Sequence, residues 1–353
     1  MKERERGPWI VLVGGFLGAG KTTLILAAAE QLRKRGLRSA MIWNDQGVDL
    51  VDSRHAALSG ARSGEVTGGC FCCRLTQLID AMSALRAHAP AVIFAEPVGS
   101  CTDLAATVLR PLLEYSDTYQ IAPLTVLVDP LRARAMMEPD ADPEMRYLFD
   151  KQWQEADLVC FTKSDLYPDY PPLTDGKVRQ LSARSGQGVA AWLDEILSGV
   201  MARGEKALEV DYSEYARAEA ALAWLNLRAT FEPVGGLSPA MLLGPLFDNL
   251  DAAFTATQIP IAHLKGLVSS DSGWVKAAIC ANGQEPVVEG NLDASPASKL
   301  DLLLNLRAVG KPEPVRAIVE RELSRSGGGV TVSQIDCFSP AAPVPERRIL
   351  KTG

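Results

Sequence analysis

The sequence predicts an α/β protein, with a mostly parallel sheet around a phosphate-binding loop, followed by a smaller α+β domain. The loop, residues 15–22, fits the pattern G-x-x-x-x-G-K-[ST] in full. Short apolar runs that end in polar residues follow it, as is typical of buried parallel strands with a ligand site at their carboxyl ends. We therefore expect a P-loop domain over 1–205, an α+β domain over 215–338 and a flexible tail over 339–353.

The bulk composition narrows the class of protein. The chain has 353 residues and a net charge of −7, with 47% hydrophobic and 22% charged residues. An acidic chain of ordinary globular composition argues against nucleic acid or an anionic membrane as a partner. The charged N-terminus lacks the apolar region of a signal peptide, and no apolar run approaches the roughly 18 residues of a membrane span. We expect a cytoplasmic protein.

The phosphate-binding loop lies between elements of the right kind. Residues 9–13 are a continuous apolar run, typical of a buried strand, and residues 23–35 are rich in helix formers until Gly36 ends the helix. Glycines let the backbone aim its N–H groups at a polyphosphate, and the helix N-terminus favours negative charge. Lys21 should reach the β- and γ-phosphates, and the Thr22 hydroxyl should bind Mg²⁺. The alternative is a glycine-rich turn without a ligand.

A polar segment follows the second predicted strand, residues 39–43. Residues 48–63 show no clear periodicity, and in a P-loop protein this position commonly holds the loop that senses the γ-phosphate. Asp45 and Asp52 are candidates to approach Mg²⁺ or to orient the attacking water. The alternative is that both are solvated loop carboxylates.

Three of the seven cysteines, Cys70, Cys72 and Cys73, crowd into one Gly-rich loop. A predicted helix follows at 75–85, with its apolar residues on one face. A helix N-terminus stabilises thiolates, and three thiolates so close could bind Zn²⁺ with a fourth position open. They would also suit Cu(I), so the sequence does not name the metal. The alternative is three packed, inert cysteines.

Two further strands end in carboxylates. The third strand, 91–95, delivers Glu96 at its carboxyl end, where it could hold the water shell of a metal or position attacking water. Gly99 follows at a position where an amide would be needed for the γ-phosphate. The fourth strand, 124–128, is followed by Asp129. We expect this residue to end the strand or cap a helix, and the alternative is that it is a ligand.

The fifth strand, 157–161, leads into a base-recognition motif. Thr162-Lys163-Ser164-Asp165 resembles the [NT]-K-x-D motif of GTP-binding proteins. In that motif the Asp carboxylate accepts hydrogen bonds from N1–H and N2–H₂ of guanine, for which adenine has no matching donors. Residues 181–184 resemble the short loop that supports guanine from its backbone.

The second domain is predicted from a change of pattern. Residues 203–214 are polar and contain Gly204, which favours a domain boundary. Beyond them, periodicity and caps predict the order β-α-β-β-β-α-β, a small α+β sheet with its helices on one face. The predicted strands are 222–231, 261–269, 273–281, 300–309 and 330–338, and the predicted helices are 238–257 and 313–324.

Together these motifs resemble the CobW-type metallochaperone GTPases, relatives of the hydrogenase and urease nickel-insertion GTPases. The resemblance rests on GGFLGAGKTT (14–23), GGCFCC (68–73), FAEPVG (94–99) and TKSDL (162–166). AHLKGLV (262–268) is similar to the R-x-K-G strand of the family's C-terminal domain, with His263 in place of the arginine. The resemblance covers nearly the whole chain and implies a CobW-type C-terminal domain.

The resemblance also implies roles at matching positions. Lys21, Glu96 and Asp45 would serve hydrolysis, and Thr22 would bind Mg²⁺. The three cysteines would hold the transferred metal, with zinc or cobalt favoured. The residues in contact with GTP would be Gly15, Gly18, Ala19, Gly20, Lys21, Thr22, Thr23, Gly99, Thr162, Lys163, Asp165, Ser182 and Ala183.

Some features depart from the family pattern. The chain has no histidine-rich tract, and residues 44–47 read NDQG where NEFG is usual. The leading hypothesis is Mg²⁺-dependent GTP hydrolysis coupled to delivery of a transition metal to a client metalloprotein or cofactor pathway. The resemblance also suggests a nucleotide-dependent homodimer. One alternative is a GTP-switched remodelling factor for a cofactor enzyme, such as a corrinoid protein, with structural cysteines. A small-molecule P-loop kinase is a more distant one.

Overall fold

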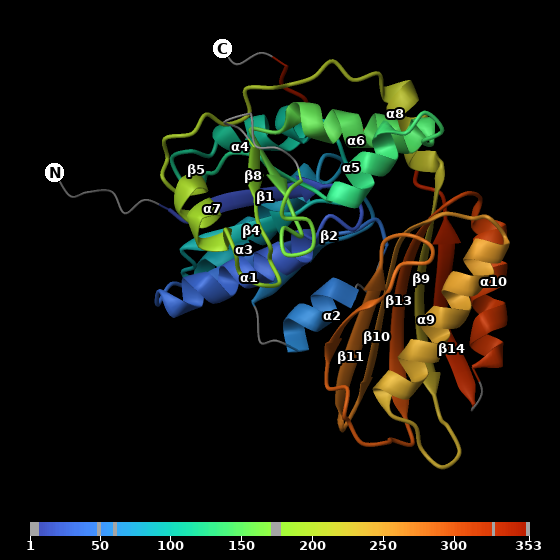
Figure 1. The fold of residues 1–353 in the computed structure, drawn as a ribbon. Coiled ribbons are helices and arrows are strands. Elements are labelled where there is room, and N and C mark those ends of the chain that lie inside the picture. Colours follow the sequence, from blue (N-terminus) through green and yellow to red (C-terminus); the bar gives the residue numbers. More distant parts are fainter. Residues whose placement is uncertain (1–6, 48–50, 59–61, 171–177, 327–328, 351–353) are drawn as a thin grey trace. The chain divides into compact units, whose positions relative to one another are not determined.

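The computed structural model describes residues 7–47, 51–58, 62–170, 178–326 and 329–350, which form two compact units (Figure 1). Unit 1 comprises residues 1–46, 56–218 and 342–353, and unit 2 comprises 47–55 and 219–341. Two segments therefore fall outside the division expected from the sequence. Residues 47–55 join the second unit, and the C-terminal residues join the first.

Unit 1 is built on a parallel sheet with the strand order β3-β2-β4-β1-β6-β7-β8, and β5 pairs with β1. Each long strand is a buried apolar run, as parallel strands covered on both faces require. The short strands β3, β5 and β8 carry little apolar signal, which is why the sequence did not predict them. The strands are β1 (Trp9–Gly15), β2 (Ser39–Asn44), β3 (Ser63–Val66), β4 (Val92–Glu96), β5 (Gln120–Ile121), β6 (Thr125–Val128), β7 (Leu158–Phe161) and β8 (Val178–Gln180).

Two helices of unit 1, α5 and α6, begin at aspartate caps. Asp129 caps α5 by accepting a hydrogen bond from the Leu131 amide (2.9 Å), and Asp142 caps α6 through the Met145 amide (2.9 Å). The predicted cap at Asp129 is thereby confirmed. The helices are α1 (Lys21–Lys34), α3 (Leu75–Leu85), α4 (Arg110–Leu113), α5 (Pro130–Met137), α6 (Pro143–Glu155), α7 (Val189–Ile196) and α8 (Tyr212–Ala220), with a π-helical turn at Ala105–Leu109.

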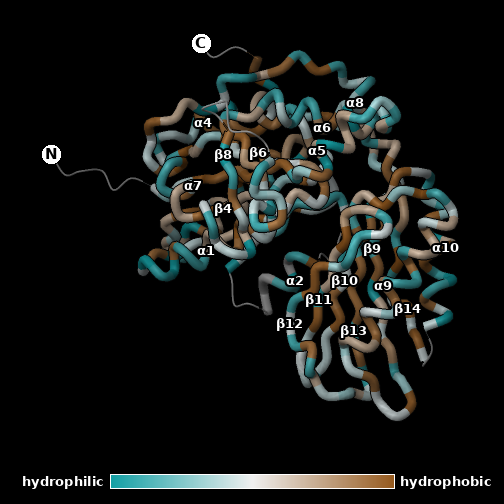
Figure 2. The backbone as a smooth tube through the Cα atoms, viewed as in Figure 1, coloured by the Kyte–Doolittle hydropathy of each residue, from teal (hydrophilic) through white to brown (hydrophobic). Residues whose placement is uncertain are grey.

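Unit 2 is an antiparallel sheet of order β12-β11-β10-β13-β9-β14, and every strand and helix predicted for it is present. The additional strand, β12, is short and mostly exposed. Helices α9 and α10 lie on one face, over strands that Figure 2 colours as hydrophobic. The elements are β9 (Leu222–Phe231), α9 (Pro239–Ala256), β10 (Ile261–Ser270), β11 (Gly273–Ile279), β12 (Val287–Gly290), β13 (Leu300–Val309), α10 (Pro312–Arg325) and β14 (Val330–Phe338).

Helix α2 (Val51–Leu58) lies in the segment that showed no clear periodicity in the sequence. Its first turn belongs to unit 2, where Val51 packs against Leu267 and Leu303. Asp52 forms an ion pair with Lys265 at 2.5 Å, and the lysine holds the pKa of that carboxyl below its usual range despite burial. Asp52, a candidate magnesium or water ligand, is therefore a structural ion-pair partner within unit 2. Among the described residues, no helix is long and apolar enough to cross a membrane.

The C-terminal residues differ from the expected flexible tail. The Ile349 amide donates to the carbonyl of Ala106 (2.9 Å), and the Glu346 amide donates to the carbonyl of Cys72 (2.9 Å). Arg348 also forms an ion pair with the buried carboxylate of Asp103 at 2.7 Å. Flexibility was predicted from the proline and charge content of the tail. That content carries no information about these partners, because they lie far away in the sequence.

Candidate functional site

The phosphate-binding loop has the backbone conformation that its glycines allow. Gly18 and Gly20 have positive φ values of 80° and 92°, and Gly20 immediately precedes α1. Gly15 has φ of 131°, and a Cβ there would lie 2.5 Å from the carbonyl oxygen of Leu127. A side chain at Gly15 would therefore clash with β6, so glycine is required at this position on two grounds.

Five predicted site residues meet at the carboxyl ends of β1 and β4. The Lys21 Nζ donates to the carbonyl of Gly15 at 2.9 Å, and Thr22 Oγ1 donates to Glu96 Oε1 at 3.1 Å. A Cβ at Gly99 would lie 3.1 Å from Lys21 Nζ, so this glycine lets its loop approach the lysine closely. Lys21, Thr22 and Glu96 are all buried. The hydroxyl and carboxylate oxygens of Thr22 and Glu96 are suitable Mg²⁺ donors.

Asp45 follows β2 at the same edge of the sheet, and its amide donates to the carbonyl of Val66 at 3.3 Å. The Asp45 side chain is half-buried, and its part in hydrolysis stays a prediction. Ala19 and Thr23 lie in the loop and in the first turn of α1, as the motif requires.

The predicted base-recognition residues lie on two neighbouring loops. The Ser164 amide donates to the carbonyl of Leu181 at 3.2 Å, which places Thr162–Asp165 beside Ser182 and Ala183. Lys163 has a positive φ of 58° and forms an ion pair with Asp129 at 2.5 Å. The Asp165 side chain is exposed, as a carboxylate that must reach a nucleotide base can be.

The three thiols form a compact cluster in the loop before α3. The sulfur of Cys70 lies 2.7 Å from that of Cys72 and 3.2 Å from that of Cys73, and Cys72 and Cys73 are 3.7 Å apart. All three sulfurs lie within 4.8 Å of one another. Cys70 and Cys72 are buried, whereas Cys73 is half-buried. These soft ligands could share one ion, so the structure brings the predicted metal residues together.

Hydrogen bonding distinguishes the three thiols of the cluster. Hydrogen bonds from Cys101, then from Cys72 and Cys73, hold the pKa of the Cys70 thiol well below its usual range. The same network raises the pKa of Cys72 and raises that of Cys73 to about 11. A cluster with one stabilised thiolate can begin to bind a cation, and the bound charge then favours loss of the remaining protons.

Two residues of this site were not predicted. Asn44, at the end of β2, donates to the carbonyls of Val66 (2.9 Å) and Gly69 (2.8 Å) and accepts from the Phe71 amide (2.8 Å). It therefore ties the cysteine loop to the sheet. Cys101 is buried, and its thiol interacts with those of Cys70 and Cys72.

The chain is similar in sequence to a known family and to two curated proteins. The nucleotide-binding domain model of the CobW/HypB/UreG family matches residues 9–186. The zinc chaperone YeiR of Escherichia coli is 25% identical over 328 residues, covering 84% of this chain and 93% of YeiR. The zinc chaperone YjiA of the same organism is 28% identical over 181 residues, covering 50% of this chain and 55% of YjiA.

Two solved structures are also similar to this chain. Zn(II)-bound YjiA GTPase from E. coli has a TM-score of 0.32 at 14% identity, over 89% of this chain and 98% of that one. HypB from Helicobacter pylori in complex with nickel has a TM-score of 0.40 at 14% identity, over 55% and 87%. The family match covers the phosphate loop, the cysteine loop and the base-recognition motif. This chain belongs to the CobW/HypB/UreG family and is a P-loop GTPase.

Proposed function

We propose that this chain is a GTP-dependent metallochaperone, in which Mg²⁺-dependent GTP hydrolysis controls binding and delivery of a transition metal ion held by Cys70, Cys72 and Cys73. The observation that carries this proposal is the cluster of three thiols within 4.8 Å, in a loop tied by Asn44 to the sheet edge of the phosphate loop. The similarity to two zinc chaperones favours zinc as the metal.

The residues around the phosphate loop would have different roles in hydrolysis. Lys21 would exchange its contact with the carbonyl of Gly15 for the β- and γ-phosphates, where its charge is needed. Thr22 and Glu96 would hold Mg²⁺, which neutralises charge that develops on the phosphates. The Gly99 amide and Asp45 would face the γ-phosphate and the attacking water. Gly15, Gly18, Ala19, Gly20 and Thr23 would complete the phosphate cradle.

Guanine would be bound by the two neighbouring loops that contain residues 162–165 and 182–183. Asp165 would accept from the two guanine donors, and the stem of Lys163 would pack along the base. Thr162 would hold the motif at the end of β7, through its amide hydrogen bond to Val128 (2.9 Å). Ser182 and Ala183 would support the base from their backbone. A client metalloprotein would receive the metal, and a nucleotide-dependent homodimer is the assembly that we propose.

The experiment is to measure zinc stoichiometry and competition-derived affinity on reduced protein, with and without a non-hydrolysable GTP analogue. We expect one tightly bound Zn²⁺, lost when Cys72 is replaced by Ala, with an affinity that the nucleotide changes. Reciprocity then requires zinc to change the affinity for GTP by the same factor. No zinc in either nucleotide state would refute the metallochaperone and favour a remodelling switch with structural cysteines.

A further inference from the structure

The C-terminal residues of unit 1 lie against the cysteine loop. We infer that residues 342–350 form a strap over this loop that must lift before a metal ion enters or leaves, an inference that rests on the proposed function. The strap has no helix or strand structure of its own. Its near end, residues 344–346, contacts the cysteine loop and α3, and its far end, residues 348–350, contacts the interior of unit 1.

The near end of the strap directs a backbone donor at a cysteine sulfur. Val344 lies between Pro343 and Pro345, and because proline has no N–H group, the Val344 amide is the one backbone donor of these three residues. That amide donates to the sulfur of Cys73 at 3.2 Å. The Val344 side chain is 73% exposed, so the contact with the cysteine loop is made by the backbone. A residue before proline favours an extended backbone, which suits a segment that lies across a loop.

Glu346 attaches the near end at two further points. Its amide donates to the carbonyl of Cys72 at 2.9 Å, and its carboxylate accepts from the amide (2.9 Å) and hydroxyl (2.7 Å) of Thr76 in the first turn of α3. Arg74, which precedes α3, provides no side-chain cap for the helix. The strap therefore supplies a carboxylate where the helix terminus favours negative charge. Cys72 and Thr76 lie on either side of Cys73 in the chain, so the strap spans this cysteine.

Cys73 is the most exposed of the three thiols. Cys70 and Cys72 are 4% and 1% exposed, whereas Cys73 is half-buried. Transfer of an ion to a client requires a donor atom of the client to approach that ion, and the approach past Cys73 meets the least protein. The Val344 amide occupies one side of this sulfur. While the strap is in place, that side is closed to an incoming donor atom, so the strap slows exchange of the ion.

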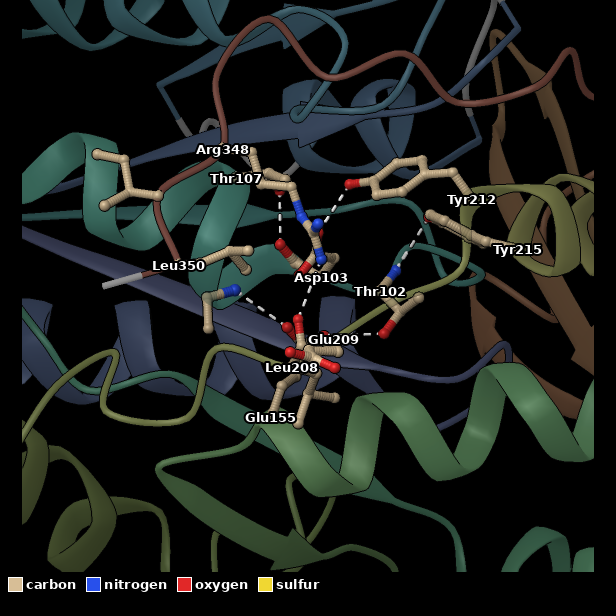
Figure 3. Close-up of polar contacts among 12 residues, drawn as sticks. Thr102, Asp103, Thr107, Glu155, Leu208, Glu209, Tyr212, Tyr215, Arg348 and Leu350 are labelled. Carbon is tan, nitrogen blue, oxygen red and sulfur yellow. Dashed lines mark hydrogen bonds and ion pairs between the residues drawn. The ribbon is translucent and has the colours of Figure 1, made fainter. Parts of the chain in front are cut away.

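Buried groups of unit 1 anchor the far end of the strap (Figure 3). Arg348 donates to Asp103 at 2.7 Å, and Tyr212 donates to the same carboxylate oxygen at 2.7 Å. The Asp103 side chain is 1% exposed, and a charge left unpaired in the interior is costly, so Asp103 requires the cation that the strap supplies. The buried guanidinium of Arg110 donates to the two final carbonyls of the strap.

The two ends of the strap therefore differ in what holds them. The hydrogen bonds of the near end to Thr76 and to the Cys73 sulfur are exposed, and water can replace them when they break. Separation of the far end would leave the carboxylate of Asp103 buried without its cation. The near end should thus open while the far end stays attached, which lets the strap return to the cysteine loop after each exchange.

The first test replaces Val344 by Pro, which removes the amide hydrogen and puts a ring carbon in its place. Val344→Ala is the matched control, because it keeps the amide and changes only an exposed side chain. Hydrogen exchange of single amides is measured on the reduced, metal-free protein. The Glu346 amide should exchange about threefold to tenfold faster in Val344→Pro, as the loss of one hydrogen bond implies. The Ile349 amide, which donates to Ala106 at the far end, should keep its wild-type rate in both variants.

The second test addresses the anchor by comparing Arg348→Gln with Arg347→Gln. The ion pair of Arg347 with Glu114 is half exposed and adds little, so its loss is the control. Arg348→Gln should speed exchange of the Glu346 and Ile349 amides together by about tenfold or more, because a charge-assisted hydrogen bond is lost and the whole strap lifts. Arg347→Gln should leave both amides at their wild-type rates.

The rate of zinc transfer from the loaded protein to a chelator then tests whether the strap controls exchange. Val344→Pro should speed transfer by the same factor as exchange of the Glu346 amide, and Val344→Ala should not. Wild-type exchange of this amide in Val344→Pro, or faster exchange with transfer at the wild-type rate, would overturn the strap and leave the metallochaperone proposal standing. A wild-type protein that binds no zinc would overturn both proposals. Val344→Pro leaves no buried charge unpaired, so the test does not depend on whether Arg348→Gln folds.

Discussion

The buried carboxyl of Glu155 should make the stability of unit 1 depend on pH, and the size of this effect can be tested. The carboxyl is fully buried at the end of α6, where it accepts from the Ala105 amide (3.0 Å) and the Thr102 hydroxyl (3.3 Å) (Figure 3). Burial, reinforced by the nearby charge of Asp103, raises the pKa of Glu155 from 4.5 to about 8. At neutral pH the folded protein therefore holds a proton that the unfolded chain has released.

The sign of the pH dependence follows from proton binding. Between the unfolded and folded pKa values the folded state binds more protons, so this group lowers stability as pH rises, by about 1.4 kcal/mol per pH unit. Over the whole window from 4.5 to about 8, the loss amounts to about 4–5 kcal/mol. Glu155→Gln is neutral at every pH, and its amide can accept from Ala105 and donate to Thr102.

We expect Glu155→Gln to match the wild-type protein near pH 4.5 and to exceed its stability at pH 8, by about 2–3 kcal/mol more than at pH 6. The assay is urea unfolding at a series of pH values, with hydrogen exchange of α6 as the local readout. Glu138→Gln is the control, because Glu138 is exposed and lies in the same region of the chain. Equal pH slopes for Glu155→Gln and wild type, or a variant less stable at pH 8, would refute the reasoning.

Three further predictions concern the site. In Gly99→Ala the new Cβ would lie 2.7 Å from Leu17 Cδ2 and 3.1 Å from Lys21 Nζ, so kcat/KM for GTP should fall by about tenfold to a hundredfold; steady-state kinetics at wild-type rates would contradict this. Asn44→Ala removes two hydrogen bonds to the cysteine loop and one to the end of β3, so unit 1 should lose about 3 kcal/mol and bind zinc more weakly. Urea unfolding and zinc competition check both effects, and unchanged zinc affinity would show that the tether is dispensable. Asp165→Asn presents a donor where guanine also donates, so selectivity should shift from GTP towards XTP by about tenfold or more; competition binding with both nucleotides measures the shift, and unchanged selectivity would remove Asp165 from the base site.

The sequence predicted the elements whose signals are local. The phosphate loop is a contiguous motif, and its glycines adopt positive φ as the pattern requires. The strands and helices of unit 2 other than β12 were predicted because alternation or 3.6-residue periodicity extends over seven or more residues in each, whereas β12 has four. Strands β3, β5 and β8 were missed because two to four residues, partly exposed, carry no periodicity. The cysteine cluster was predicted because its three members are adjacent in the chain.

Only the tertiary structure brought distant residues together. Asp52 lies at a position where a P-loop protein commonly senses phosphate, yet it pairs with Lys265, more than two hundred residues away. Asn44 joins the cysteine loop from the end of β2 and Cys101 from the segment after β4, and the tail reaches Asp103 from the other end of the chain. Local sequence determines which backbone conformation a segment favours, because that preference depends on neighbouring residues. The choice of partner for a buried charge or thiol depends on which strands pair, and strand pairing is decided by burial over the whole sheet.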